Sequence, residues 1–488
     1  MTSSDRRRPL RVAVIGAGFG GLAAAVKLRQ RTTASFTIFE QADGVGGTWW
    51  VNRYPGCEVD VHSHAYSFSF LKYEWLRTHA TQPELLVYAE HVANVFGLRD
   101  HLRLSTRVTS LTWEDDGQYY VVGTDRGEHL KFDAVICALG LLSIPRYPEW
   151  PGLESFRGPC FHTSRWEDEH DLFGKTVAIV GTGSTAVQIA PAIASRVKQL
   201  YVYQREPGWI EPKHERSFTL RELWIYRNVP LAQRIHRAWI FAKSVKRFQG
   251  LDVASSRQLE MRQLCTNFIH DTITDPATRA AVTPDYPWGC KRPVVASTFY
   301  QALNRHNVEL VPHAVTSVAE DSIVDETGTR RKADVLILST GFQPTHFLGG
   351  LEVKGRDGRS IHDVWSQRPS AFLGITVAGF PNLFILYGPN TNGGLSIIAQ
   401  LERQAEVAVA AIRRLQHGAR SVDTRPAAQR AYVRWIDRRL ARHASATDAG
   451  CRNYYHVAGG ANVTQWPGTH FLYAAVTRLL ARVGLVFR

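Results

Sequence analysis

Two glycine-rich turns, each set between a β-branched strand and a helix of small residues, constrain the fold of this chain more than any other feature. The first turn follows a strand over residues 11–15 and carries Gly16, Gly18 and Gly21 in a Gly-x-Gly-x-x-Gly spacing. Apolar residues at helical period come next, and a second strand over residues 35–39 follows. This order of strand, glycine turn, helix and strand is typical of dinucleotide-binding domains.

Each residue of the first turn has a mechanical role in holding a dinucleotide. Gly16 permits a tight turn, Gly18 lets the backbone approach a pyrophosphate, and Gly21 lets the helix pack closely on the strand. The N-terminus of the helix favours the negative charge of the phosphates. Glu40 lies 19 positions after Gly21, near the roughly twenty expected for an acid that binds both ribose hydroxyls. The first turn therefore predicts a dinucleotide without a 2′-phosphate.

The same construction recurs farther along the chain. A strand over residues 175–180 leads into a second glycine turn, a helix over 187–194 and a strand over 199–203. Ala186 replaces the third glycine, which is an accepted variant. Arg205 stands 19 positions after Ala186, where a cation binds a 2′-phosphate, so this turn predicts NADPH. The alternative is an exposed arginine at the end of a strand.

Two nucleotide sites of opposite ribose preference indicate a flavoprotein reductase or monooxygenase, with FAD at the first turn and NADPH at the second. The predicted fold class is α/β, with two Rossmann-like dinucleotide-binding domains and a helical insertion. Strands over 132–140 and 333–341 each end in small residues, where the chain can pass between domains. We expect the FAD domain to comprise residues 1–146 and 342–488, the NADPH domain 147–212 (with a linker) and 286–341, and the helical insertion 213–285.

The composition excludes several other classes of protein. The chain has 488 residues, of which 44% are apolar and 21% charged, so it is neither disordered nor fibrous. Its longest uncharged stretch, 369–401, is interrupted by glycines and prolines, so we expect no membrane segment. The basic run at 6–8 precedes an apolar run too short for an export signal. We therefore predict a cytoplasmic protein with a short basic tail.

The charge pattern and the cysteines exclude further kinds of partner and site. The net charge of +14 is spread along the chain without interleaved aromatic residues, so we expect no nucleic-acid partner. Six cysteines without a C-x-x-C pair argue against a zinc ribbon, an iron–sulfur site or a secreted disulfide scaffold. We expect six packed thiols and no metal site. The alternative to this expectation is a metal site formed by Asp60, His62 and His64.

Four further motifs lie in order along nearly the whole chain. They are Gly-Gly-Thr-Trp at 46–49 with Asp60 and Tyr66 downstream, Phe-x-Gly-x-x-x-His-x-x-x-Trp at 156–166, Gly-Cys-Lys-Arg-Pro at 289–293, and Asn-Tyr-Tyr at 453–455 with Trp466. In kind and order they resemble the type I Baeyer–Villiger monooxygenases, within the class B flavoprotein monooxygenases. Glu167 departs slightly from the Pro or Asp of that family. Trp166 matters because the related flavin-containing monooxygenases generally have Tyr or Phe there.

The resemblance implies a fold and a reaction. The fold is an FAD domain split around an NADPH domain, with a helical insertion in the latter. In a family member, NADPH reduces the flavin, O₂ adds at its C4a carbon, and the deprotonated C4a-peroxyflavin attacks a ketone carbonyl to give an ester or lactone. Both the anionic peroxide and the anionic adduct need a fixed positive partner.

The resemblance also assigns the catalytic residues Arg292, Asp60 and His162. Arg292 is expected to stabilise both anions, because a guanidinium does not lose its proton. Asp60 is expected to position Arg292, and His162 to act indirectly, through hydrogen bonds in a linker that couples the two domains. Lys291 resembles the residue that holds the 2′-phosphate together with Arg205.

The predicted cofactor-binding residues combine the two turns with the resemblance. They are Gly16, Gly18, Gly20, Gly21, Glu40, Gly47, Thr48, Trp49, Asp60, Tyr66, Val108, Gly181, Thr182, Gly183, Ser184, Thr185, Ala186, Arg205, Lys291 and Arg292, with the loop 388–394 near the isoalloxazine. The expected substrates are a ketone and O₂. Two alternatives stay open: N- or S-oxygenation by the same cofactors, and a non-catalytic flavin- or nucleotide-binding redox sensor. The identity of the ketone and the oligomeric state also stay open, with a monomer as one possibility.

Overall fold

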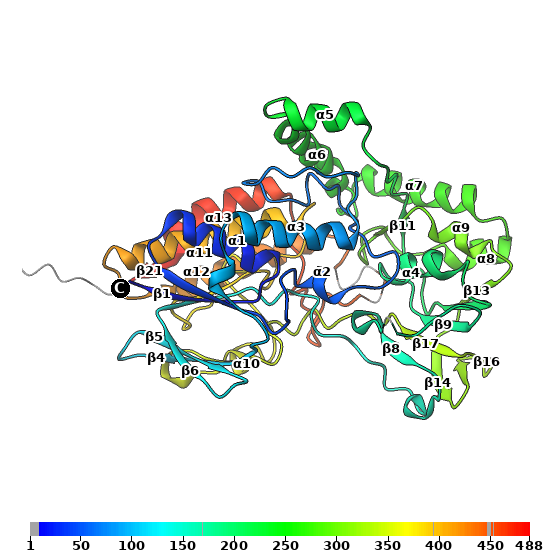
Figure 1. Ribbon diagram of the computed structural model, residues 1–488, viewed down its shortest axis with the longest axis horizontal. Helices are drawn as coiled ribbons and strands as arrows, with labels where there is room; N and C mark the ends of the chain where they lie inside the picture. Colours follow the sequence, from blue (N-terminus) through cyan, green and yellow to red (C-terminus); the bar gives the residue numbers. More distant parts are fainter. Residues whose placement is uncertain (1–8, 168, 394, 447–449, 452) are drawn as a thin grey trace, which may run out of the picture.

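The computed structural model describes residues 9–167, 169–393, 395–446, 450–451 and 453–488. The predicted basic run at 6–8 and Gly394 of the predicted glycine loop lie outside the described residues. Figure 1 shows two halves, with β1 (Arg11–Ile15) in the left half and β9 (Thr176–Val180) in the right half. Helices α5 (Leu220–Asn228) and α6 (Ala232–Gln249) project at the top of this view.

The left half is built on a parallel five-stranded sheet of order β19-β7-β1-β2-β3. Beside β1, its strands are β2 (Ser35–Phe39), β3 (Leu102–Arg103), β7 (Ala134–Cys137) and β19 (Leu383–Ile385). A parallel sheet is covered on both faces, so its strands are continuous apolar runs. Val12, Ala13 and Val14 are accordingly fully buried.

Helices from both ends of the chain cover this sheet. The first glycine turn leads into α1 (Phe19–Arg31), which packs against α11 (Ile397–Gln416), and α11 packs against α13 (His470–Gly484). A smaller sheet of order β18-β4-β5-β6 lies below in Figure 1, formed by β4 (Val108–Glu114), β5 (Tyr119–Thr124), β6 (His129–Phe132) and β18 (Glu352–Lys354). The other elements of this half are α2 (Thr48–Val51), α3 (Gln82–Val95), α10 (Ile361–Val364), α12 (Pro426–Leu440), β20 (Val422–Thr424) and β21 (Leu485–Phe487).

The right half contains a second parallel sheet, of order β13-β10-β9-β17-β8. Beside β9, its strands are β8 (Cys160–His162), β10 (Gln199–Tyr203), β13 (Val308–Val311) and β17 (Val335–Leu338). All of them lie between β7 and β19 in sequence, so the first sheet is assembled from two distant parts of the chain. The other elements here are α4 (Ala186–Ile193), α9 (Phe299–Leu303), β11 (Ile210–Glu211), β12 (Val294–Val295), β14 (Val315–Ala319), β15 (Ser322–Asp325) and β16 (Arg330–Lys332). The predicted α/β class with two such sheets is confirmed.

A helical segment separates β11 from β12. After α5 and α6 it contains α7 (Ser256–Thr272) and α8 (Pro276–Val282). The start of α5 is fixed by a capping box, in which the side chains of Thr219 and Glu222 each accept a backbone hydrogen bond at the helix N-terminus. Within the part of the chain that the structure describes, no helix is both long and apolar enough to cross a membrane.

The expectation of six packed thiols is wrong for two of the cysteines. Cys290 and Cys451 form a disulfide, with 6.3 Å between their Cα atoms. They are 161 residues apart in the chain, and local spacing carries no signal for a pair that only the fold brings together. The other four, Cys57, Cys137, Cys160 and Cys265, are free thiols, and all but the partly buried Cys160 are buried.

Candidate active site

The first glycine turn has the geometry that the sequence predicts. Gly16 has a φ of +101°, which favours glycine, and a Cβ on Gly21 would lie 1.8 Å from the Gly16 carbonyl oxygen. A Cβ on Gly18 would lie 3.5 Å from the Gly47 Cα, so two glycine backbones face each other beside the N-terminus of α1. This bare backbone at a helix N-terminus fits a pyrophosphate.

Glu40 lies at the end of β2 beside this turn and is 8% exposed. Its carboxylate accepts hydrogen bonds from the backbone amides of Ala17 at 2.7 Å and Ala42 at 2.9 Å. These two bonds fix the carboxylate against the glycine turn and leave acceptor positions for ribose hydroxyls. Of the other predicted residues here, Gly20 packs against Ala138, Thr48 opens α2, and Val108 is buried at the start of β4.

The second glycine turn differs from the first in the space around its middle glycine. Gly181 has a φ of +114°, and a Cβ there would lie 2.4 Å from the Ser339 carbonyl oxygen. At Gly183, by contrast, a Cβ would meet no atom within 4 Å. The protein itself therefore does not require glycine at position 183, whereas a phosphate approaching the backbone would. The predicted Thr182, Ser184 and Thr185 continue this turn, and Ala186 begins α4.

The two predicted 2′-phosphate cations lie close to each other. Arg205 is exposed directly beyond β10. Lys291 forms an ion pair with Glu206 at 2.5 Å. Burial lowers the pKa of Lys291, Glu206 opposes that shift, and the charge of Arg205 adds to it. Two cations within electrostatic reach of each other favour an added dianion between them.

Asp60 and Arg292, which are 232 residues apart, form a hydrogen-bonded ion pair. Burial alone would raise the pKa of Asp60, but the Arg292 guanidinium, together with the charges of Arg247 and Lys213, holds that pKa below its ordinary value. Asp60 in turn is the main cause of a raised pKa for Arg292. Both groups therefore stay charged. The Arg292 side chain remains 40% exposed, so part of it is open to an approaching molecule.

Phenol and indole side chains surround this pair. The Trp49 indole donates a hydrogen bond to the Tyr66 hydroxyl at 3.3 Å, and the two rings meet edge to face. Burial raises the pKa of Tyr66, and the charges of Asp60 and Arg292 both act on it. Tyr387 and Tyr454 also interact with Arg292, and both raise its pKa. The pair thus lies near Tyr66, which contacts Trp49 of α2, and near tyrosines of the C-terminal part of the chain.

Two further ion pairs near Asp60 were not predicted from the sequence. Lys213, whose side chain is 1% exposed, pairs with Glu58 at 2.6 Å. Arg247 of α6 pairs with Glu211 of β11 at 2.7 Å. Lys213 and Arg247 both contribute to the lowered pKa of Asp60. Three acid–base pairs therefore share one region, and no motif or spacing in the sequence signals the two outer pairs.

His162 has both ring nitrogens engaged within the protein. Its Nδ1 accepts a hydrogen bond from the Ser164 amide at 3.1 Å, so Nε2 carries the proton and donates to the Gly341 carbonyl at 3.0 Å. The same carbonyl accepts from the Arg146 amide at 2.9 Å. Burial also lowers the pKa of His162. The ring therefore bonds to the same carbonyl as the Arg146 amide, and it has no free nitrogen for a substrate proton.

Four histidines gather where the loop after Asp60 meets α6. Nδ1 of His64 lies 2.8 Å from Nδ1 of His236, and the His62 ring is 5.0 Å from the His236 ring and 5.9 Å from the His79 ring. Burial and the neighbouring histidines lower the pKa of His62 and of His64 to about 3. Burial, with the charge of Lys213, lowers the pKa of His79 to about 4.

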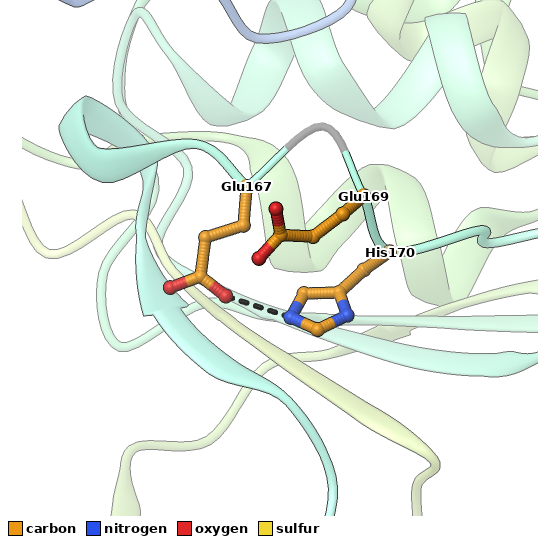
Figure 2. Close-up of side chains that lie close together, drawn as sticks. All are labelled: Glu167, Glu169 and His170. Carbon is orange, nitrogen blue, oxygen red and sulfur yellow. Dashed lines mark hydrogen bonds and ion pairs between the residues drawn. The ribbon is translucent and has the colours of Figure 1, made fainter.

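A metal site needs at least three ligand atoms close together. Among the described residues, the histidine cluster does not meet this condition, whereas Glu167, Glu169 and His170 have ligand atoms within 4.8 Å of one another. Figure 2 shows these side chains converging, with His170 Nε2 paired to Glu167 at 2.7 Å. The group is largely solvent-accessible and has an internal ion pair, which accounts for its geometry without a metal. Trp166 beside it packs edge to face on Phe161 at 5.2 Å.

The buried histidines predict a loss of stability on mild acidification. The unfolded chain takes up protons at the ordinary histidine pKa of 6.5, whereas folded His64 does so only near 3. The free energy of unfolding should therefore fall as the pH drops below about 6.5, by up to about 1.4 kcal/mol per pH unit for each buried histidine. Denaturant unfolding at a series of pH values would measure this slope. His64→Gln should make the slope shallower, and an unchanged slope would refute the assignment.

Known proteins share this architecture. Residues 13–256 match the family described as pyridine nucleotide-disulphide oxidoreductase. A Baeyer–Villiger monooxygenase of Pseudomonas aeruginosa is 38% identical over 475 residues, which cover 96% of this chain and 90% of that protein. Cyclohexanone monooxygenase from Rhodococcus sp. Phi1 bound to NADP⁺ has a TM-score of 0.88 at 29% identity, covering 99% of this chain and 100% of that one. The OTEMO complex with FAD and NADP has a TM-score of 0.87 at 26% identity, covering 98% and 99%.

Proposed function

The chain belongs to the Baeyer–Villiger monooxygenases, and on this premise we propose that it inserts one oxygen atom of O₂ beside a ketone carbonyl at Asp60 and Arg292. The observation that carries the proposal is their ion pair: a permanently charged guanidinium, fixed by a carboxylate and partly open, beside Trp49 and Tyr66. The product is an ester or a lactone. A cytoplasmic location, favoured by the composition, is part of the proposal.

The cofactors are FAD and NADPH. We place FAD on the first glycine turn, with its pyrophosphate at Gly18 and the N-terminus of α1 and its ribose at Glu40. We place NADPH on the second turn, at Gly183, with its 2′-phosphate between Arg205 and Lys291. When bound, the flavin supplies the redox chemistry that activates O₂, with NADPH as the hydride donor.

Arg292 and Asp60 have different roles in this proposal. The Arg292 guanidinium keeps its charge at any working pH and stabilises the negative charge that develops on the substrate oxygen. A fixed donor of this kind contributes on the order of 3 kcal/mol at the reacting step. Asp60 holds the guanidinium in one direction through its hydrogen bond. Neither group transfers a proton.

His162 is a positioning residue in this account. Its Nε2 and the Arg146 amide donate to the same Gly341 carbonyl, which supports a crossing between the FAD and NADPH domains near residues 146 and 341. The proposed division of the chain is therefore 1–146 and 342–488 for FAD, 147–212 and 286–341 for NADPH, and 213–285 for the helical insertion. A neutral, hydrogen-bonded imidazole at this junction keeps the two linkers together.

Arg205→Ala should weaken the binding of NADPH but not that of NADH. Without the guanidinium, the KM for NADPH should rise at least about tenfold, the equivalent of about 1.4 kcal/mol, while the KM for NADH stays the same. Initial-rate measurements with both cofactors check this. Arg196→Ala, which removes an exposed arginine paired with Asp171, is the matched control. An equal rise for NADPH and NADH would show that the 2′-phosphate is held elsewhere.

The substrate class is tested by product analysis. Purified protein should be incubated with NADPH and with matched linear, cyclic, aromatic and polycyclic ketones, and in parallel with amines and sulfides. The proposal predicts ester or lactone formation from at least one ketone class, in proportion to the NADPH consumed. Oxygenated amines or sulfides without any ester, or hydrogen peroxide alone, would overturn it.

A further inference from the structure

The Cys290–Cys451 disulfide joins two segments that meet at Arg292. Cys290 immediately precedes Lys291 and Arg292 in the chain. Its partner Cys451 begins the segment that carries Tyr454 and Tyr455. The Cα separation of 6.3 Å is within the ordinary range for a disulfide. Cys290 itself is fully buried against Trp209, Met261 and Trp288, so one end of the bond is anchored in a packed core.

Noncovalent contacts also join the same two segments, and they converge on the arginine. Asn453 Nδ2 donates to the Cys290 carbonyl at 3.2 Å, and Asn453 Oδ1 accepts from the Tyr455 amide at 3.0 Å. The backbone of Arg292 forms a hydrogen bond with Tyr455, and the charge of Arg292 acts on Tyr454. Tyr454 is nevertheless 42% exposed. The segment is thus fixed at Cys451, while one tyrosine beside the arginine stays open to an approaching molecule.

We propose that the Cys290–Cys451 disulfide is a redox-controlled clamp: it holds the segment with Tyr454 and Tyr455 against Arg292, and its reduction releases that segment and lowers oxygenation. The inference rests on the proposed function. In the reduced form, the Asn453–Cys290 hydrogen bond and the hydrogen bond between Tyr455 and the Arg292 backbone still join the two segments, but no covalent bond does. A displacement of about 1 Å near reacting groups can cost on the order of 100-fold in rate, so loosening the segment matters for the reaction.

Hydrogen peroxide can oxidise the two cysteines to the disulfide, and a dithiol can reduce the disulfide again. Two thiols and one hydrogen peroxide give the disulfide and two waters; the two sulfurs lose two electrons and the peroxide gains them. Hydrogen peroxide forms when NADPH oxidation is uncoupled from oxygen insertion, so a poorly coupled enzyme produces the oxidant that closes its own clamp. A dithiol reductant opens it by exchange, leaving two cysteine thiols and a cyclic disulfide. Disulfides in reducing compartments are usually transient or redox-sensing.

The test compares the wild type, Cys451→Ser and Cys265→Ala as holoenzymes. Cys265 is a free buried thiol packed in the same cluster as Cys290, so its replacement is the matched control. Each protein is reduced with a dithiol, or oxidised with hydrogen peroxide, and then desalted. Alkylation under denaturing conditions followed by mass spectrometry counts the free thiols. Ester formed per NADPH consumed and the rate of flavin reduction are measured on the same samples.

The clamp predicts two fewer alkylated cysteines in oxidised wild type than in reduced wild type. Reduction should lower the ester formed per NADPH at least about tenfold, with flavin reduction much less affected. Cys451→Ser should stay at the reduced value under both treatments, and Cys265→Ala should follow the wild type. Equal thiol counts, or equal coupling in both wild-type states, would overturn the inference. Reduced wild type serves as the open form if Cys451→Ser does not fold.

Hydrogen exchange needs no catalytic turnover, so it tests the clamp independently of the proposed function. Backbone hydrogen exchange over residues 453–456 should quicken on reduction of the wild type and of Cys265→Ala, and should be fast in Cys451→Ser under both treatments. If no ketone is converted in any redox state, the proposed function is wrong. The hydrogen-exchange result then still shows whether the disulfide holds the segment in place. Exchange that does not respond to reduction overturns the clamp even if ketones are converted.

Discussion

Replacement of Arg292 by alanine is expected to lower ester formation at least about 100-fold while NADPH still reduces the flavin. The reason is that the guanidinium contributes only where negative charge develops on the substrate oxygen, and removal of one such donor costs about 100- to 1,000-fold in kcat. Hydride transfer occurs on the NADPH side and does not use this charge. Bleaching of the flavin absorbance under anaerobic conditions measures the first half of the reaction, and product analysis measures the second.

Two comparisons make this result specific to Arg292. Arg227→Ala removes an exposed arginine that pairs with Glu74 and should leave both half-reactions unchanged. Arg292→Lys keeps the positive charge but loses the planar fork that pairs with Asp60, so it should recover only part of the ester formation. Oxygenation by Arg292→Ala at the wild-type rate would refute the role assigned to the residue.

The second large effect is expected at the middle glycine of each turn. Gly183→Ala should raise the KM for NADPH by about 10- to 100-fold without loss of stability, because an added Cβ meets no protein atom within 4 Å and only the bound pyrophosphate would be displaced. Gly18→Ala should weaken the retention of FAD, since its Cβ would make an ordinary contact with Gly47 at 3.5 Å but would enter the space for the phosphates. Initial rates and flavin content after gel filtration check both.

A matched pair within the second turn separates cofactor binding from folding. Gly181→Ala should destabilise the protein itself, because its Cβ would lie 2.4 Å from the Ser339 carbonyl oxygen at a φ of +114°. Thermal unfolding should therefore distinguish Gly181→Ala from Gly183→Ala even without NADPH. If Gly183→Ala bound NADPH as the wild type does, the second turn would not be the NADPH site.

Of the four strands beside the two glycine turns, three were predictable to the residue, while the expected strand 175–180 begins one residue before β9 (Thr176–Val180). The expected bounds 11–15, 35–39 and 199–203 are those of β1, β2 and β10. Parallel strands buried on both faces give uninterrupted apolar runs, and the turns that end them require glycine for local backbone reasons. Such signals are contained within a few residues, so the sequence alone carries them.

Element ends that depend on tertiary context were less predictable. Within the expected helical insertion 213–285, apolar residues at helical period over 235–243 indicate a helix, but α6 runs from Ala232 to Gln249. Its N-terminus follows Leu231, which has a φ of +64° and no side-chain capping bond. The sequence therefore contains no capping residue from which this start could be predicted. A helix boundary set by packing rather than by a cap leaves no local pattern.

Long-range pairs explain most of what the sequence could not show about the site. The Cys290–Cys451 bond joins residues 161 apart, and the Glu58–Lys213 pair likewise joins two different segments of the chain. The Asp60–Arg292 pair was expected, but only through the resemblance to a family and not through any spacing. Pairing of this kind depends on how the two halves of the molecule meet, which local composition does not encode.

The most direct test of the central claim is oxygen labelling. The protein, NADPH and a ketone that it converts are incubated under ¹⁸O₂ in unlabelled water, and the product is analysed by mass spectrometry. The account predicts one ¹⁸O atom in each ester, at one ester per NADPH in the fully coupled enzyme, and loss of that labelled ester in Arg292→Ala. An unlabelled ester, or labelled hydrogen peroxide as the sole product, would contradict it.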